Sequence, residues 1–316
     1  MPFLRTSVIA FIAVAVILFS AMPGFLLVKK KMISESAIPA FSKLLLYVAS
    51  PCLVIFSFTS SPFSVEKLID LGVFALVTLV LHGVMMGGAY LFLRKKYKQT
   101  IYRIITVATT FGNCAFFGIP LIEALLPELA PQLIIYTSVY SFIMNVLGWT
   151  VASAIISGDS RYVTVKKILL NPTAISTAVA LLLFITELPI YPDLGNMIEI
   201  TGKMCTPLSM LIMGMRLATV KLPTLFTNYR IYLTVAAKQL LMPLVGFAIV
   251  FFLPVDAGVR AALFIISACP VASVVLNYSE LVGEGQKEAA NMVLLGTMLS
   301  IITLPIVMLI LPLLGV

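Results

Sequence analysis

Long apolar runs separated by short polar loops constrain this chain more than any other feature. Hydrophobic residues make up 61% and charged residues 11% of its 316 positions, whereas soluble domains carry about 25% charged residues. So much apolar surface needs lipid around it, and a spanning helix takes roughly 20 apolar residues. We predict an all-α membrane protein with ten spans, at about residues 7–28, 36–60, 69–93, 101–126, 132–157, 171–187, 197–219, 231–253, 257–282 and 288–314.

The basic residues give these spans a direction. The net charge is +8, but the lysines and arginines flank apolar spans, so the positive-inside rule explains them better than a nucleic-acid partner does. Placing the lysines at 29–31 in the cytoplasm puts most of the 21 basic residues there, while Arg5, Lys67 and Arg260 fall outside. We predict an integral membrane protein with both termini outside.

The spans divide into two halves of five. We predict a first repeat over residues 1–157 and a second over residues 171–316, joined by a cytoplasmic linker at residues 158–170. An odd number of spans in each half gives the halves opposite orientations, as in transporters built from inverted repeats. The basic linker suits the headgroup surface, and a plain tether is the alternative.

Two spans are interrupted at corresponding places. Span 4 is interrupted over residues 110–120, which include Gly118 and Pro120, and span 9 is interrupted over residues 267–273, which include Pro270, 150 residues after Pro120. Proline removes a backbone donor and clashes with the preceding turn, so each break is expected to leave a helix N-terminus near mid-membrane. The first turns beyond the breaks, around residues 121–123 and 271–273, then favour an anion. Such paired interruptions indicate a transporter's substrate site, and simple proline kinks are the alternative.

Polar side chains near the breaks are the candidates for substrate binding. Asn113 can donate its amide to a carboxylate or cap a helix end, and Ser273 can bond a ligand or its own backbone. Lys238 in span 8 can attract an anion, pair with a carboxylate or snorkel to the headgroups. The predicted site comprises Asn113, Gly118, Pro120, Lys238, Pro270, Ser273 and Asn277.

Other polar residues in the spans leave more than one role open. His82 can relay protons or remain a neutral, hydrogen-bonded histidine, and the second role is favoured. Asn145 can face the site or join two helices, and joining is favoured. Glu123 and Glu280 lie near span ends, where an interfacial place competes with proton coupling. The four cysteines have no metal-binding spacing, so neither a metal site nor a cofactor is predicted.

Several short motifs occur in a characteristic order along the chain. They are Gly112-Asn113 followed by Gly118-Ile119-Pro120, Asn171-Pro172 at the start of span 6, Lys238 with Pro243 in span 8, Ala268-Cys269-Pro270 in span 9, and the closing run at 294–305. In order and spacing they resemble the auxin efflux carrier family of membrane transport proteins, which includes plant auxin carriers and prokaryotic carriers of malate and malonate. The short central loop resembles the prokaryotic members, which implies a prokaryotic plasma (inner) membrane and makes auxin a poor substrate guess.

The resemblance implies a ten-helix fold of two inverted five-helix repeats. Spans 1, 2, 6 and 7 would form a scaffold through which two copies dimerise. Spans 3–5 and 8–10 would form a transport domain that moves by an elevator mechanism, with the broken helices 4 and 9 crossing at the site.

The sequence therefore predicts a secondary active transporter of a small organic anion, with a proton or a sodium ion as the coupling ion. A sodium-coupled symporter of the bile-acid or arsenite type is one alternative, and a non-transporting membrane sensor is another. An enzyme is not expected, because the chain has one histidine, no HExxH motif and no nucleophile with a nearby base.

Overall fold

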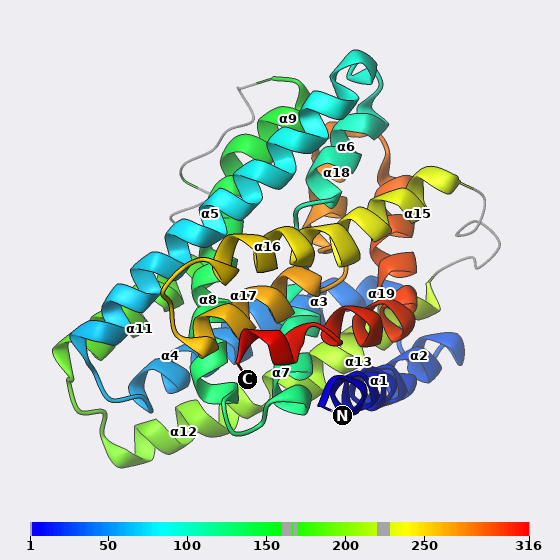
Figure 1. Ribbon diagram of the computed structural model, residues 1–316. Helices are drawn as coiled ribbons and strands as arrows, with labels where there is room; N and C mark the ends of the chain where they lie inside the picture. The colour runs from blue at the N-terminus through cyan, green and yellow to red at the C-terminus, as the bar shows by residue number, and fades with distance from the viewer. Residues whose placement is uncertain (1, 160–165, 167–169, 220–227, 316) are drawn as a thin grey trace.

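The computed structural model describes residues 2–159, 166, 170–219 and 228–315 of the chain, and these are almost entirely helical (Figure 1). Within these ranges there is no strand, only an isolated antiparallel bridge between Gly112 and Val271. The all-α class is confirmed. Most of the predicted linker at 158–170 lies outside the described residues.

The helices follow the predicted apolar ranges, although α1, α5 and α12 begin four or five residues earlier than predicted. Those of the first half are α1 (Pro2–Ser20), α2 (Met22–Lys29), α3 (Ile38–Leu44), α4 (Ser50–Thr59), α5 (Val65–Leu93), α6 (Thr100–Ala108), α7 (Ile119–Leu125), α8 (Ala130–Leu147) and α9 (Ser153–Ser157). Those of the second half are α11 (Pro172–Thr186), α12 (Pro192–Lys203), α13 (Cys205–Ala218), α15 (Tyr229–Ala236), α16 (Met242–Phe251), α17 (Ala257–Ala268), α18 (Val274–Val282) and α19 (Gln286–Met308). Short 3₁₀ turns lie at Glu35–Ala37, Arg94–Lys96 and Leu311–Leu314.

Six helical stretches of the described chain are long and apolar enough to cross a membrane. Shorter apolar helices accompany them at Cys114–Leu125, Pro172–Thr186 and Ala257–Ala268. Large apolar side chains cover the outside, where Phe92 is 88% exposed and Phe252 is 83% exposed. Lys238, by contrast, is fully buried. An apolar surface above a buried charge fits a protein whose solvent is lipid.

Five-residue π-helical turns precede a proline at several places in the fold. The turns are Leu45–Ala49 before Pro51, Cys114–Gly118 before Pro120, and Ala237–Leu241 before Pro243. In an ordinary α-helix the proline ring clashes with the carbonyl four residues back. A π turn is wider and moves that carbonyl. These prolines therefore lie inside helical stretches that continue through them.

Close packing between helices of the two halves uses glycine. Helix α2 packs against α13, while α11 and α12 both pack against α4. A Cβ on Gly24 would overlap the Leu211 carbonyl, and one on Gly214 would overlap the Ala21 carbonyl. Small residues let membrane helices approach this closely. A second set of contacts joins α5 with α8 and α16, and α17 with α16 and α8. In Figure 1, α16 and α17 lie side by side at the centre of the molecule.

Candidate functional site

Two helical stretches are interrupted near the middle of the fold. Helix α6 ends at Ala108 and helical structure resumes at Cys114, so the first break is residues 109–113. Helix α17 ends at Ala268 and α18 begins at Val274, so the second break is residues 269–273. The bridge between Gly112 and Val271 shows that the two breaks cross as antiparallel extended segments.

Backbone hydrogen bonds hold the crossing together. The main-chain N–H of Asn113 donates to the Pro270 carbonyl at 2.7 Å. The Ala272 amide donates to the Phe111 carbonyl at 2.9 Å. Each break thus satisfies polar groups that the other break frees, which an irregular segment inside a membrane protein requires.

The expected start of the helix after the first break was wrong. Pro120 follows the π turn Cys114–Gly118 and is buried in the first turn of α7, so it does not interrupt the helix. The new helix start is at Cys114 rather than at residues 121–123, and in the second half it is at Val274 rather than at 271–273. Pro120 and Pro270 therefore do not occupy equivalent places.

Asn113 caps the helix that starts after the first break. Its side-chain Oδ1 accepts a hydrogen bond from the Phe116 amide at 3.3 Å. Its main-chain carbonyl accepts from the Phe117 amide at 3.2 Å and the Gly118 amide at 3.0 Å. Asparagine is among the preferred residues at this position because it satisfies amides that the first turn leaves open. The partly buried side chain still has its amide NH₂ to offer to a ligand.

A cavity of about 660 Å³ reaches the crossing. Gly112 and Asn113 line it from the first break, and Ala272 and Ser273 line it from the second. The remaining lining residues come from both halves of the chain. They include Glu35, Ser42, Lys43, Ser50, Ser141, Asn145, Asn171, Arg216, Asn277 and Glu280. Its volume lies in the range of pockets that hold small molecules.

Arg216, on α13, is the cavity residue that the sequence analysis missed. Its guanidinium Nη2 donates to Ser42 Oγ at 3.3 Å, and its Cζ lies 5.9 Å from the centre of the Phe116 ring. A small neighbouring pocket, lined by Arg216, Asn113 and Ser273, links it to both breaks. The orientation predicted from the sequence placed Arg216 with the cytoplasmic basic residues, since it lies near the end of span 7. The signal that could have found it was its place inside an apolar run, two residues after Gly214.

The predicted site residues separate into two groups. Asn113, Ser273 and Asn277 line the cavity, and Asn277 is exposed. The other four, Gly118, Pro120, Lys238 and Pro270, are buried and do not line it. Substrate binding by either group stays a prediction.

Lys238 and Gly118 support the crossing from behind. Lys238 is fully buried, and its Nζ donates to the Ser267 carbonyl at 2.6 Å and to the Cys269 carbonyl at 2.9 Å. It therefore does not snorkel to the membrane surface. A Cβ on Gly118 would stand 3.1 Å from Cys269 Sγ, so a larger residue there would crowd the second break.

His82 and Asn145 each make a structural hydrogen bond. His82 is fully buried, with Nδ1 2.8 Å from the Thr78 carbonyl, and its ring packs against Tyr140 and Phe111. Asn145 Oδ1 accepts from Asn171 Nδ2 at 3.1 Å, which joins α8 to the start of α11.

Glu123, on α7, accepts a hydrogen bond from Thr206 on α13 at 2.8 Å. Glu280 lines the cavity and is exposed. No group of three histidine, cysteine or acidic residues that could hold a metal ion occurs in the described part of the chain.

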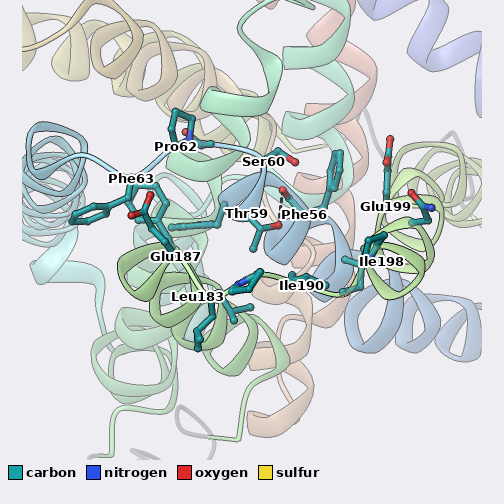
Figure 2. Close-up of a pocket in the computed structure, with 18 residues that line it drawn as sticks. Phe56, Thr59, Ser60, Pro62, Phe63, Leu183, Glu187, Ile190, Ile198 and Glu199 are labelled. Atoms are coloured by element: carbon teal, nitrogen blue, oxygen red, sulfur yellow. Dashed lines mark hydrogen bonds between the residues drawn. The ribbon is translucent and has the colours of Figure 1, made fainter.

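A second pocket of about 490 Å³ lies away from the crossing, between the end of α4 and the segment that joins α11 to α12 (Figure 2). Figure 2 shows Glu187 near Phe63 and Leu183, with Glu199 across the pocket. Glu199 already pairs with Lys203 at 2.5 Å. The described residues that line this pocket include Glu187 and Glu199 and no basic residue. Lys43 and Arg216 accompany Glu35 and Glu280 in the cavity at the crossing, so this pocket is the poorer place for an anion.

Comparison with known proteins agrees with the predicted resemblance. The profile of a family described as membrane transport protein matches residues 9–308, nearly the whole chain. A search of curated proteins finds no match.

Proposed function

Since the chain belongs to the family of membrane transport proteins, we propose that it is a secondary active transporter of a small organic anion, with carboxylates as the substrate class. The observation that carries this proposal is the cavity that ends at the crossing of the two breaks and is lined by Asn113 and Arg216. Interrupted helices beside a cavity are the usual place of a transporter's substrate site.

Arg216 and Asn113 favour a carboxylate over a cation, although Glu35 and Glu280 also line the cavity. The guanidinium of Arg216 presents a rigid fork of donors that matches a carboxylate, and the Asn113 amide adds a neutral donor. Each hydrogen bond to a charged group contributes about 1.5–3 kcal/mol. Two or three such bonds approach the roughly 4–8 kcal/mol that millimolar to micromolar affinity requires.

The position of the cavity supports an elevator mechanism. Arg216 and Ser50 line it from the predicted scaffold, whereas Asn113, Ser141 and Ser273 line it from the predicted transport domain. A substrate held there would contact both the scaffold and the transport domain. A sliding movement of the transport domain along the scaffold would then carry the substrate across the membrane. We propose that this movement occurs within two inverted five-helix repeats, and that the scaffold helices form a homodimer.

The predicted orientation makes this conformation open to the cytoplasm. The cavity includes Glu35, Lys43, Asn171 and Thr219, which lie at or near the predicted cytoplasmic ends of their spans. Both termini would then be outside in a prokaryotic inner membrane. Labelling of cysteines introduced near residues 63 and 96 in intact cells tests this orientation, which fails if residue 96 is modified from outside.

Substrate binding to the purified protein tests the function. Malonate, malate, their neutral amides and cationic amines are compared by calorimetry, and any binder is then followed by tracer uptake into proteoliposomes. Arg216→Gln should weaken carboxylate binding roughly 10- to 100-fold, because a hydrogen bond to a charged group is lost. Arg260→Gln is the matched control, since Arg260 bonds the Leu253 carbonyl and does not line the cavity. Binding of amines without binding of carboxylates would overturn the proposal.

A further inference from the structure

Lys238 lies at the crossing, where its charged Nζ donates hydrogen bonds to main-chain carbonyl oxygens. It belongs to the π turn Ala237–Leu241 and is fully buried. Both hydrogen-bond partners of its Nζ, the carbonyls of Ser267 and Cys269, belong to the end of α17 and the start of the second break. A Cβ on Gly112 would stand 3.1 Å from the same Nζ, so the ammonium also touches the first break.

The break of α17 creates the need for a cation at this point. In an uninterrupted helix the carbonyls of residues 267 and 269 would accept bonds from amides four residues further on. The chain leaves the helix after Ala268, so these oxygens need other donors. They also lie at the C-terminal end of α17, which carries partial negative charge and favours cations. In many transporters, unwound carbonyls and half-helix ends of this kind coordinate the coupling ion.

We infer that the Lys238 ammonium is a tethered cation that occupies the place where a crossed-helix carrier can bind a free sodium ion. The covalent stem delivers the charge to the two carbonyls, and like charge keeps a second cation away. The crossing therefore needs no sodium to stay assembled, and the carrier needs no sodium gradient at this point. The statement about the gradient rests on the proposed transport function; the statement about cation binding does not.

Thermal unfolding of the purified full-length protein tests the inference without a known substrate. The midpoint is measured in chloride salts of sodium, potassium, ammonium and N-methylglucamine at equal ionic strength. Wild type should unfold at the same temperature in sodium and in N-methylglucamine. Lys238→Ala should be less stable in N-methylglucamine and should regain roughly 5 °C in ammonium or sodium, because the empty space admits a free cation that binds the native state.

Lys238→Met is the matched control. Its side chain fills most of the space but has no charge, so its midpoint should be low and should not respond to ammonium or sodium. A saturable rise of the wild-type midpoint with sodium would overturn the inference, and so would a Lys238→Ala protein that no cation stabilises. If Lys238→Ala does not fold, two other results decide the inference. It is supported if sodium leaves the unfolding midpoint of the wild type unchanged and Lys238→Met unfolds at a lower temperature than the wild type. A Lys238→Met protein as stable as wild type then overturns it.

The outcome is separable from that of the carboxylate proposal. A sodium response of the wild type would remove the tethered-cation role and leave carboxylate binding at Asn113 and Arg216 untouched. Failure of every carboxylate to bind would remove the substrate class, while the cation experiment would still report whether Lys238 replaces an ion.

Discussion

The two breaks meet at one point but are stabilised in different ways. The first is stabilised by its own side chain, because Asn113 caps the helix that follows and faces the cavity. The second has no such cap, since Ser273 makes no side-chain bond to the start of α18. It is held instead from the preceding side by Lys238, which bonds the Cys269 carbonyl of the break and the Ser267 carbonyl at the end of α17. The difference suggests that the two breaks have different roles, in which the first contacts the ligand and the second is held in place by Lys238.

His82 and Lys238, the buried residues that support the two breaks, also differ in how tightly they hold them. His82 and Lys238 lie 156 residues apart, the offset that also separates Pro51 from Pro207 in spans 2 and 7. Both are fully buried beside the crossing. His82 packs its ring against Phe111 of the first break, whereas Lys238 donates to the second. An aromatic contact leaves the first break freer to adjust than two charge-assisted hydrogen bonds leave the second.

Gly112→Ala should have the largest effect on stability. The added Cβ would stand 3.1 Å from Lys238 Nζ and 3.2 Å from Cε, so it would push the ammonium from its carbonyls. Crowding and weakened charged hydrogen bonds together should cost about 2–4 kcal/mol. Thermal unfolding in detergent measures this loss. Gly83→Ala is the control, because a Cβ there meets nothing within 4 Å; equal stability of both variants would mean that Lys238 does not anchor the second break.

Asn113→Ala should reduce substrate binding more than it reduces stability. The loss of a helix cap costs about 1 kcal/mol, so expression and membrane insertion should stay near normal. The loss of a donor to a carboxylate should weaken binding roughly 10- to 100-fold. Calorimetry with the best carboxylate checks the second effect. Unchanged binding would make Asn113 a structural cap alone.

Asn113→Asp separates the two roles of this residue. An aspartate accepts the same bond from the Phe116 amide, and aspartate and asparagine cap helices about equally well. The thermal midpoint should therefore stay close to that of wild type. The negative charge that this substitution adds should repel a carboxylate substrate, so carboxylate binding should fall at least as far as in Asn113→Ala. A carboxylate that binds this variant normally would show that Asn113 does not face the substrate.

The apolar runs made much of the fold predictable, because solvation by lipid sets the length and spacing of helices regardless of their neighbours. The position of the first break was not predictable from Pro120, because a π turn accommodates that proline and no residue type identifies a π turn. Gly112 and Asn113, the residues at the actual break, were visible as a polar interruption of an apolar run.

The site was predictable only where a side chain acts beside its own break. Asn113 and Ser273 belong to the breaks and line the cavity. Arg216 reaches the cavity from α13, and only the packing of α13 near the breaks brings it there. Lys238 was recognised as a buried charge, but its partners lie about 30 residues further along the chain. Tertiary contacts of this kind leave no local pattern in the sequence.

Ser273→Ala should have the smallest effect and gives the sharpest test of the division between the breaks. Ser273 lines the cavity but caps no helix, so the free energy of unfolding should change by less than about 0.5 kcal/mol. If the second break is mainly an anchor, the hydroxyl gives the substrate at most one weak bond, and carboxylate binding should fall by less than about tenfold. Calorimetry on Ser273→Ala and Asn113→Ala, side by side, measures the ratio. An equal loss in both variants would mean that both breaks meet the ligand, and that Lys238 anchors a segment which itself binds substrate.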